Sequence, residues 1–174
     1  MVTANTDILV IAGIPASGKS TFARKLQKEG FYYISLNGED DAARTEQLQR
    51  DAYLAYRRGD TERLLELLSQ SPGPVVVEYG FPPDEGNLQV VRGLRGGGAR
   101  FVWFECPNDV ARGRYRKRER GRAAAMAAFD RQIALIEERR DQITAAANPQ
   151  FVQVLRGKAP KGHDELRREI FNDP

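Results

Sequence analysis

Short apolar runs alternate along the chain with longer segments in which apolar residues recur at helical spacing. The apolar runs that predict strands are residues 8–12, 31–36, 74–79, 100–105 and 151–155. The segments that predict helices are residues 19–29, 41–57, 61–70, 84–94, 108–118 and 126–144. Strands that alternate with helices favour a parallel sheet with helices on both faces. We therefore expect an α/β fold with three layers, α/β/α, around a five-stranded parallel sheet.

The most specific motif, Gly13 to Ser20, joins the first predicted strand to the first predicted helix. Its sequence, GIPASGKS, fits G-x-x-x-x-G-K-[ST] at every fixed position. Gly13 and Gly18 can adopt backbone angles that are closed to other residues, so the loop can turn its N–H groups toward phosphate oxygens. Because a buried strand precedes the motif and a helix begins inside it, we interpret it as a phosphate loop rather than an ordinary glycine-rich turn.

The residues of this loop have distinct expected roles. Lys19 is expected to reach the β- and γ-phosphates of a bound nucleotide, and Ser20 to place its hydroxyl on Mg²⁺. The other nucleotide contacts are expected mainly from the backbone of Gly13, Ala16, Ser17, Gly18 and Thr21.

Carboxylates follow two of the predicted strands at the edge where parallel sheets bind ligands. After the second strand come Glu39, Asp40 and Asp41, which suit either a helix N-terminus or a base for an acceptor hydroxyl, with Asp40 favoured as the base. The third strand ends at Glu78, a single acid closing an apolar run. Such a carboxylate suits a metal site that holds Mg²⁺ and its water shell, although a partly exposed strand end is the other interpretation.

The wall of an acceptor pocket is expected from aromatic residues and from the helices between the second and third strands. The aromatic candidates are Tyr33, Tyr79 and Phe81.

One segment makes the protein basic. Residues 112–122 hold seven basic residues and one acidic residue, a charge of +6, whereas the whole chain has a formal net charge of +3. Phosphoryl transfer spreads negative charge over the γ-phosphate oxygens, so we expect a short arginine-rich lid at about residues 112–125. Arg114 and Arg118 lie four apart, on one helical face, and are its candidate catalytic residues. A nucleic-acid patch is the alternative, although Tyr115 is the only aromatic residue available for base stacking there.

Composition limits the class of protein. The chain has 174 residues, of which 41% are apolar, enough for the core of one domain spanning residues 1–174. No stretch is apolar enough for a membrane span, residues 1–7 do not read as a secretion signal, and a lone Cys106 excludes an internal disulfide. We expect a cytoplasmic protein.

Together these features resemble the small P-loop kinases of the nucleotide-kinase-like group, in particular the P-loop ATP-binding proteins called AAA domain 33. The resemblance spans nearly the whole chain and rests on the phosphate loop, the acidic stretch after the second strand, the pattern of residues 75–81, and Cys106-Pro107 followed by arginines. It implies the P-loop NTPase fold, ATP with Mg²⁺, and Arg118 in the lid. It also implies an adenine-holding loop after the fifth strand, which would contain Arg156, Lys158 and Pro160, with His163 nearby as a surface or capping residue.

The chain departs from that family at two places. Pro83 replaces the arginine that follows the third strand of adenylate kinases, which argues against a nucleoside monophosphate acceptor. Ser35-Leu36-Asn37 stands where the family often has Ser-x-Asp, so the base is expected at Glu39 or Asp40.

We therefore expect an ATP-dependent phosphotransferase that moves the γ-phosphate to a hydroxyl of a small-molecule acceptor. A polynucleotide 5′-hydroxyl kinase would use the same centre, with the basic segment tracking a strand. An ATP-binding or ATP-hydrolysing switch protein without an acceptor is the remaining alternative.

Overall fold

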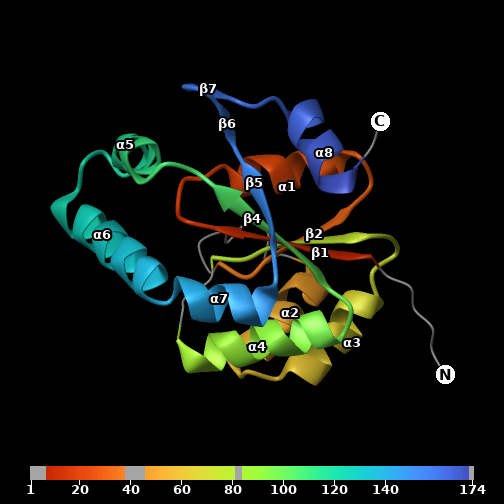
Figure 1. Cartoon of the computed structure of the whole chain (residues 1–174). Coiled ribbons are helices and arrows are strands. Elements are labelled where there is room, and N and C mark those ends of the chain that lie inside the picture. The colour runs from red at the N-terminus through yellow and green to blue at the C-terminus, as the bar shows by residue number, and fades with distance from the viewer. Residues whose placement is uncertain (1–6, 38–45, 81–83, 173–174) are drawn as a thin grey trace.

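The structure, a computed structural model, describes residues 7–37, 46–80 and 84–172. Its strands are β1 (Ile8–Gly13), β2 (Tyr32–Ser35), β3 (Val75–Glu78), β4 (Arg100–Glu105) and β5 (Gln150–Gln153). They form one five-stranded sheet in the order β2-β3-β1-β4-β5, and all four neighbouring pairs are parallel (Figure 1). The predicted α/β class and the parallel sheet are confirmed.

Helices cover both faces of the sheet (Figure 1). One face carries α1 (Lys19–Lys28) and α8 (His163–Phe171); the other carries α2 (Gln47–Arg57), α3 (Thr61–Ser69), α4 (Glu85–Gly96) and α7 (Arg140–Ala147). Two more helices, α5 (Asn108–Arg118) and α6 (Ala123–Glu138), project beyond the carboxyl end of β4. None of the helices in the part of the chain that the structure describes has the length and apolar character needed to cross a bilayer.

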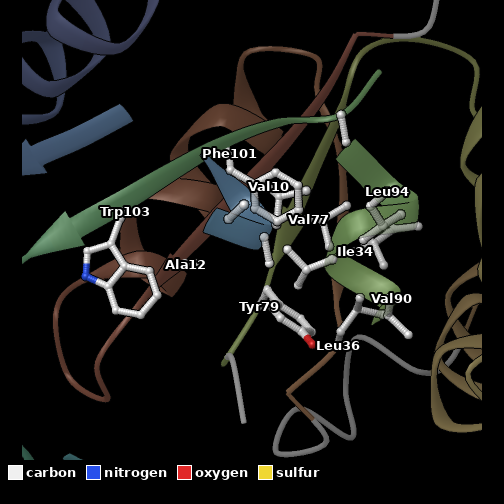
Figure 2. Packing of buried hydrophobic residues seen from close by; sticks show 14 of the residues in the cluster. Val10, Ala12, Ile34, Leu36, Val77, Tyr79, Val90, Leu94, Phe101 and Trp103 are labelled. Carbon is white, nitrogen blue, oxygen red and sulfur yellow. The ribbon is translucent and has the colours of Figure 1, made fainter. Parts of the chain in front are cut away.

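The central strand β1 is buried on both faces, which explains its continuously apolar sequence. Val10 and Ala12 pack into the core beneath α2, α3, α4 and α7 (Figure 2), whereas Leu9 and Ile11 pack beneath α1 and α8. Side chains alternate between the faces of a strand, so a strand covered on both sides needs apolar residues at every position.

The predicted helix over residues 126–144 is wrong as a single element. The chain forms α6 and α7 instead, with a break at Arg139, where φ is −106° and ψ is 15°. The break lets α7 lie on the sheet face beside α4 while α6 projects away from it (Figure 1). Ile136 and Ile143, one on each side of the break, enter the same core, so the apolar spacing that suggested one helix is equally compatible with two.

The carboxyl-terminal part also differs from expectation. The strand predicted over residues 151–155 ends at Gln153, and Leu155–Arg156 (β6) pairs instead with Ala159–Pro160 (β7) in an antiparallel hairpin. The helix that follows, α8, was not predicted, although Leu166 and Ile170 lie four apart and are buried against β5 and α1. The predicted helix over residues 41–57 begins at Gln47 in the structure, and residues 41–45 lie outside the described part of the chain.

The strand order brings distant segments of sequence to one end of the sheet. β3 lies between β1 and β2, so Glu78 at its end is level with Ile11 of β1 and with Ser35 of β2. The loop that follows β1 and the residues that follow β2 therefore both lie next to Glu78. This arrangement assembles the candidate active site.

We expect the core to respond to truncation in proportion to burial. Leu94 of α4 is fully buried against the sheet (Figure 2), and Leu94→Ala should lower the free energy of unfolding by about 2–5 kcal/mol through lost burial and a new cavity. Leu135→Ala is the matched control, because Leu135 is 44% exposed on α6 and its truncation should cost less than about 1 kcal/mol. Urea unfolding measures both, and equal losses would contradict the assigned core.

Candidate active site

The loop from Gly13 to Ser20 has the backbone geometry that its glycines suggest. Gly13 has φ of 143° and Gly18 has φ of 100°, in the region that favours glycine. A Cβ atom on Gly13 would also lie 2.8 Å from the backbone oxygen of Phe104, so no side chain fits there. Ala16, with φ of 60°, takes a left-handed conformation that is uncommon for alanine. The loop is therefore held in one specific shape at the N-terminus of α1.

Lys19 and Ser17 present polar groups inside this loop. The Lys19 side chain is buried, and its Nζ donates hydrogen bonds to the backbone oxygens of Gly13 and Ile14 at 2.9 and 2.8 Å. The Ser17 hydroxyl is also buried and has no hydrogen-bond partner among the described residues. A buried hydroxyl without a partner is costly, and an oxygen of a bound phosphate would satisfy it.

Glu78 is the centre of the polar network beneath the loop. Its Oε1 accepts hydrogen bonds from the Ser20 hydroxyl at 2.6 Å and from Asn37 Nδ2 at 2.7 Å, and its Oε2 accepts one from the Tyr33 hydroxyl at 2.5 Å. The residue is only 4% exposed. A buried carboxylate needs such partners. Three donors thus hold one carboxylate in place: Tyr33 of β2, Ser20 of α1 and Asn37, two residues after β2.

These side chains fit a magnesium ion, which prefers oxygen ligands. Ser20 and Glu78 supply a hydroxyl and a carboxylate in contact with one another. Asn37 adds Oδ1, a buried oxygen without a hydrogen-bond partner in the part of the chain that the structure describes. Gly80 lies against it, and a Cβ atom there would come within 2.5 Å of Asn37 Oδ1.

The phosphate loop and Glu78 open into one large cavity of about 740 Å³. This volume lies within the usual range of small-molecule sites, about 300–1,000 Å³. Most of the site residues predicted from the sequence line it: Ala16, Ser17, Gly18, Lys19, Ser20, Thr21, Glu78, Arg114, Arg118 and Pro160.

Other predicted site residues lie elsewhere. Arg156 turns to Glu165, with its guanidinium 2.7 Å from the carboxylate, and lines a second, shallower cavity. Lys158 lies in the exposed turn between β6 and β7 and lines neither cavity. Asp40, with Glu39 and Asp41, lies outside the described residues.

The expected aromatic wall is rearranged. The Tyr33 hydroxyl donates a hydrogen bond to Glu78, and Tyr33 does not line the cavity. Tyr79 is fully buried, with its hydroxyl 2.8 Å from Asn87 Oδ1. Phe81 lies outside the described residues. The wall comes instead from α2, through Tyr53 and Tyr56, as the expectation of helices between the second and third strands allowed.

The basic segment is partly used to hold its own helices. Arg112 forms a two-pronged ion pair with Asp130 of α6, at 2.8 and 3.0 Å, which fastens α5 to α6. Arg118 and Arg122 both pair with Glu119, and Arg118 also lies over the Tyr115 ring at 4.7 Å. Arg114 lines the cavity and has no hydrogen bond or ion pair to any described residue. The structure thus brings Arg114 and Arg118 of α5 to the cavity wall, and their catalytic role stays a prediction.

Sequence reasoning missed several residues at the cavity, among them Arg57, Gln132 and Lys25. Tyr53 and Arg57 lie four apart on α2, a spacing that places them on one helical face and could have signalled a shared surface. Gln132 of α6 carried no such signal. Its Nε2 reaches the backbone oxygen of Gly80 at 3.3 Å, a contact that only the packing of α6 creates.

His163 is more than a surface residue. It begins α8 and also lines the cavity, and its ring packs on Phe22 of α1 with a centroid distance of 4.9 Å. Its Nε2 lies 2.5 Å from Glu29 Oε1, and Arg167 donates to the other oxygen of the same carboxylate. Partial burial by itself would raise the pKa of Glu29, but hydrogen bonds from His163 and Arg167, with their charges, outweigh it and hold that pKa below its usual range. The cluster ties α8 to α1 at one wall of the cavity.

Comparison with known proteins places the chain in a family. The sequence model of an AAA domain family, AAA domain 33, matches residues 8–143, most of the chain. The chain belongs to this AAA domain family. Among curated proteins, none matches its sequence.

Solved structures share the fold of this AAA domain protein. The shikimate kinase of Acinetobacter baumannii, in complex with shikimate, is 14% identical, with a TM-score of 0.59, and the match covers 97% of this chain and 95% of that one. A gluconokinase from Sinorhizobium meliloti 1021 is 20% identical, with a TM-score of 0.55 and coverage of 94% and 88%. Shikimate kinase from Aquifex aeolicus is 20% identical, with a TM-score of 0.57 and coverage of 95% and 94%. The chain therefore has the P-loop fold of small-molecule kinases.

We expect the Glu29 cluster to give a pH-dependent contribution to stability. Because the pKa of Glu29 is lower in the folded protein, its contribution is complete above the pKa of the unfolded chain and is lost as pH falls through the folded pKa. The free energy of unfolding lost in Glu29→Gln should therefore be largest near pH 7 and shrink below about pH 4.3. Glu138→Gln, at an exposed glutamate without an ion pair to described residues, is the control. A Glu29→Gln loss that stays constant across urea titrations from pH 7 to pH 3.5 would contradict this.

Proposed function

We propose that this protein transfers the γ-phosphate of ATP to a hydroxyl group of a small-molecule acceptor. The observation that carries the proposal is that one cavity contains the phosphate loop, the Ser20–Glu78 pair and the arginines of α5. Each supplies a different requirement of phosphoryl transfer, namely phosphate binding, metal binding and charge neutralisation.

The loop and its neighbours would bind the triphosphate and its metal. Backbone N–H groups at the N-terminus of α1 favour anions, and Lys19 adds a positive charge at the same end. Ser20 and Glu78 would hold Mg²⁺, which would supply Lewis-acid neutralisation of the charge that develops on the phosphate oxygens. Tyr33 and Asn37 keep the Glu78 carboxylate in one orientation for this task.

The adenine end would lie toward the β6–β7 hairpin. Pro160 and Lys161 of this hairpin region line the cavity, as does Val154, which precedes it. Arg156 and Lys158, expected at the nucleotide from the resemblance, would contribute through the shape of the hairpin backbone, since their side chains lie away from the cavity.

The transfer itself makes one bond and breaks one. The acceptor oxygen joins the γ-phosphorus while the bond from that phosphorus to the β–γ bridging oxygen breaks, which leaves ADP and a phosphate monoester. Arg114 and Arg118 stabilise the negative charge that spreads over the moving group. The hydroxyl proton passes to a carboxylate base, for which Asp40 remains our proposal, with Glu39 as the alternative.

A second candidate function is a polynucleotide 5′-hydroxyl kinase. Arg116, Lys117 and Arg120 are exposed, lie outside the cavity and make no hydrogen bond or ion pair to described residues. Three such cations on α5 and just after it, near the lining residues Arg114 and Arg118 in sequence, could follow a phosphate backbone, and binding would then weaken steeply with salt.

The test is transfer of labelled γ-phosphate from ATP, with Mg²⁺, to pooled metabolites and to 5′-hydroxyl oligonucleotides in parallel. Lys19→Ala should lower the rate at least roughly a hundredfold, because it removes a preorganised cation at the reacting phosphate. Lys28→Ala, on the same helix but outside the cavity, is the control. Label on a metabolite supports the proposal and label on the oligonucleotide supports the second function. Free phosphate alone would point to a switch protein without an acceptor.

The metal role of Glu78 has its own test. Tyr33→Phe removes one of the three hydrogen bonds that orient this carboxylate, so the Mg²⁺ concentration for half-maximal transfer should rise roughly twofold to tenfold. Tyr32→Phe is the matched control, because the Tyr32 hydroxyl donates to Glu46, away from the cavity. An unchanged Mg²⁺ requirement in Tyr33→Phe would argue against the metal role.

A further inference from the structure

We infer that the acceptor carries an anionic group, a carboxylate or a phosphate, which pairs with the guanidinium of Arg57. This inference rests on the proposed function and names the class of substrate that the same cavity accepts. Arg57 belongs to none of the sequence motifs; the position of α2 brings it to the cavity.

Arg57 is positioned at the cavity without a protein partner. It is the last residue of α2, it lines the cavity, and it makes no hydrogen bond or ion pair to any described residue. In contrast, Arg50 of the same helix donates a hydrogen bond to Gln47, and Arg63 of α3 pairs with Glu66. A cation near a helix C-terminus is favoured by the helix dipole, but this explains the charge and not its place on the cavity wall.

The charge around the cavity leaves Arg57 available for the acceptor. Six lysines and arginines line it, against one carboxylate, Glu78, among the lining residues that the structure describes. Two of these cations have carboxylate partners, since Arg118 pairs with Glu119 and Lys161 with Glu169. Lys19 in the loop and Arg114 in α5 serve the triphosphate in the proposed function.

Lys25 and Arg57 are the remaining cations, and the helices that carry them, α1 and α2, lie on opposite faces of the sheet. Lys25 is on α1 and also lines the second cavity beside α8, so it belongs to the side of the proposed adenine site. Arg57 is on α2, on the other face of the sheet. It therefore lies at the end of the cavity that the nucleotide does not fill.

The surroundings of Arg57 suit the carbon skeleton of such an acceptor. Tyr53 and Tyr56, on the same helix, also line the cavity, and their ring centroids are 6.3 Å apart. The Tyr56 hydroxyl is held by Asn87 at 2.7 Å, so Tyr56 offers its ring rather than its hydroxyl. A compact molecule can thus place its anionic group on Arg57 and its carbon skeleton on the tyrosine rings, with a hydroxyl left to reach the phosphate loop.

Arginine is the side chain best suited to this recognition. Its planar guanidinium presents paired N–H donors that match the two oxygens of a carboxylate or a phosphate. An anionic acceptor therefore gains a charge-assisted contact with Arg57 that a neutral alcohol lacks.

The experiment compares acceptors in matched sets that share a skeleton. One set is glucose, gluconate and glucose 6-phosphate; another is glycerol, glycerate and glycerol 3-phosphate. Transfer is measured with labelled ATP, and binding of each compound is measured by calorimetry with ADP and Mg²⁺ present. We expect an anionic member to exceed its neutral counterpart at least roughly tenfold in kcat/KM and in affinity. Within each set, a preference for the carboxylate compound indicates a carboxylate substrate, and a preference for the phosphate compound indicates a phosphorylated substrate.

Variants then connect this preference to Arg57. In Arg57→Gln the KM and the Kd for the best anionic compound should rise roughly tenfold to a hundredfold, with little change in kcat or in the KM for ATP. Arg57→Lys should restore part of the loss. Arg58→Gln is the matched control, because Arg57 and Arg58 are both exposed but only Arg57 lines the cavity.

The outcomes separate this inference from the proposed function. If neutral compounds are the best acceptors, or if Arg57→Gln behaves like Arg58→Gln, the inference is overturned while the kinase function stands. If anionic compounds bind in an Arg57-dependent way and no compound is phosphorylated, the inference holds and the proposed function fails. If no compound shows an anion preference in transfer or in binding, the inference is overturned.

Discussion

The buried carboxylate of Glu78 is the interaction on which the candidate active site depends. It lies at the end of β3 and accepts three hydrogen bonds. They come from Ser20 of α1, from Tyr33 of β2 and from Asn37 in the segment after β2. Removing a carboxylate from water is costly unless donors replace the water, so these three side chains and Glu78 constrain one another. The strand order makes this possible, because β3 lies between β1 and β2 and brings all three chain segments to one point. The phosphate loop, the Ser20–Glu78 pair and Asn37 are thereby held next to one another at one end of the sheet.

The charge of the basic segment has two different uses. Arg112 pairs with Asp130, and Arg118 and Arg122 share Glu119, so part of the positive charge holds α5 and α6 in their positions beyond the sheet. Arg114 and Arg118 also line the cavity. The helix that carries both, α5, is anchored by Tyr115, whose ring packs on Phe129 of the core at 4.9 Å. A set of arginines that looks uniform in sequence is therefore divided by the fold into structural cations and cavity cations.

The two ends of the cavity are built by different parts of the chain. The phosphate loop and the α1–α8 wall, with His163 and Glu29 between them, form one end. The other end is formed by α2, which supplies Tyr53, Tyr56 and Arg57, and by Gly80, which Gln132 of α6 contacts from outside the sheet. A fold does not by itself identify an acceptor, and this second end is the part of the cavity that the short sequence motifs do not describe.

The sequence by itself determined the local parts of this protein. The apolar runs located all five strands of the sheet, the G-x-x-x-x-G-K-[ST] motif located the loop, and the spacing of Arg114 and Arg118 placed both on one face of α5. These succeed because periodicity and glycine geometry act over a few residues. Only the tertiary structure decided that the chain breaks at Arg139, that Tyr33 serves Glu78 rather than the acceptor pocket, and that Arg57 lines the cavity while Arg156 turns away from it. Each of these depends on residues that are distant in sequence and meet only when helices pack on the sheet. An apolar stripe or a charged residue in the sequence does not indicate which residue it will contact.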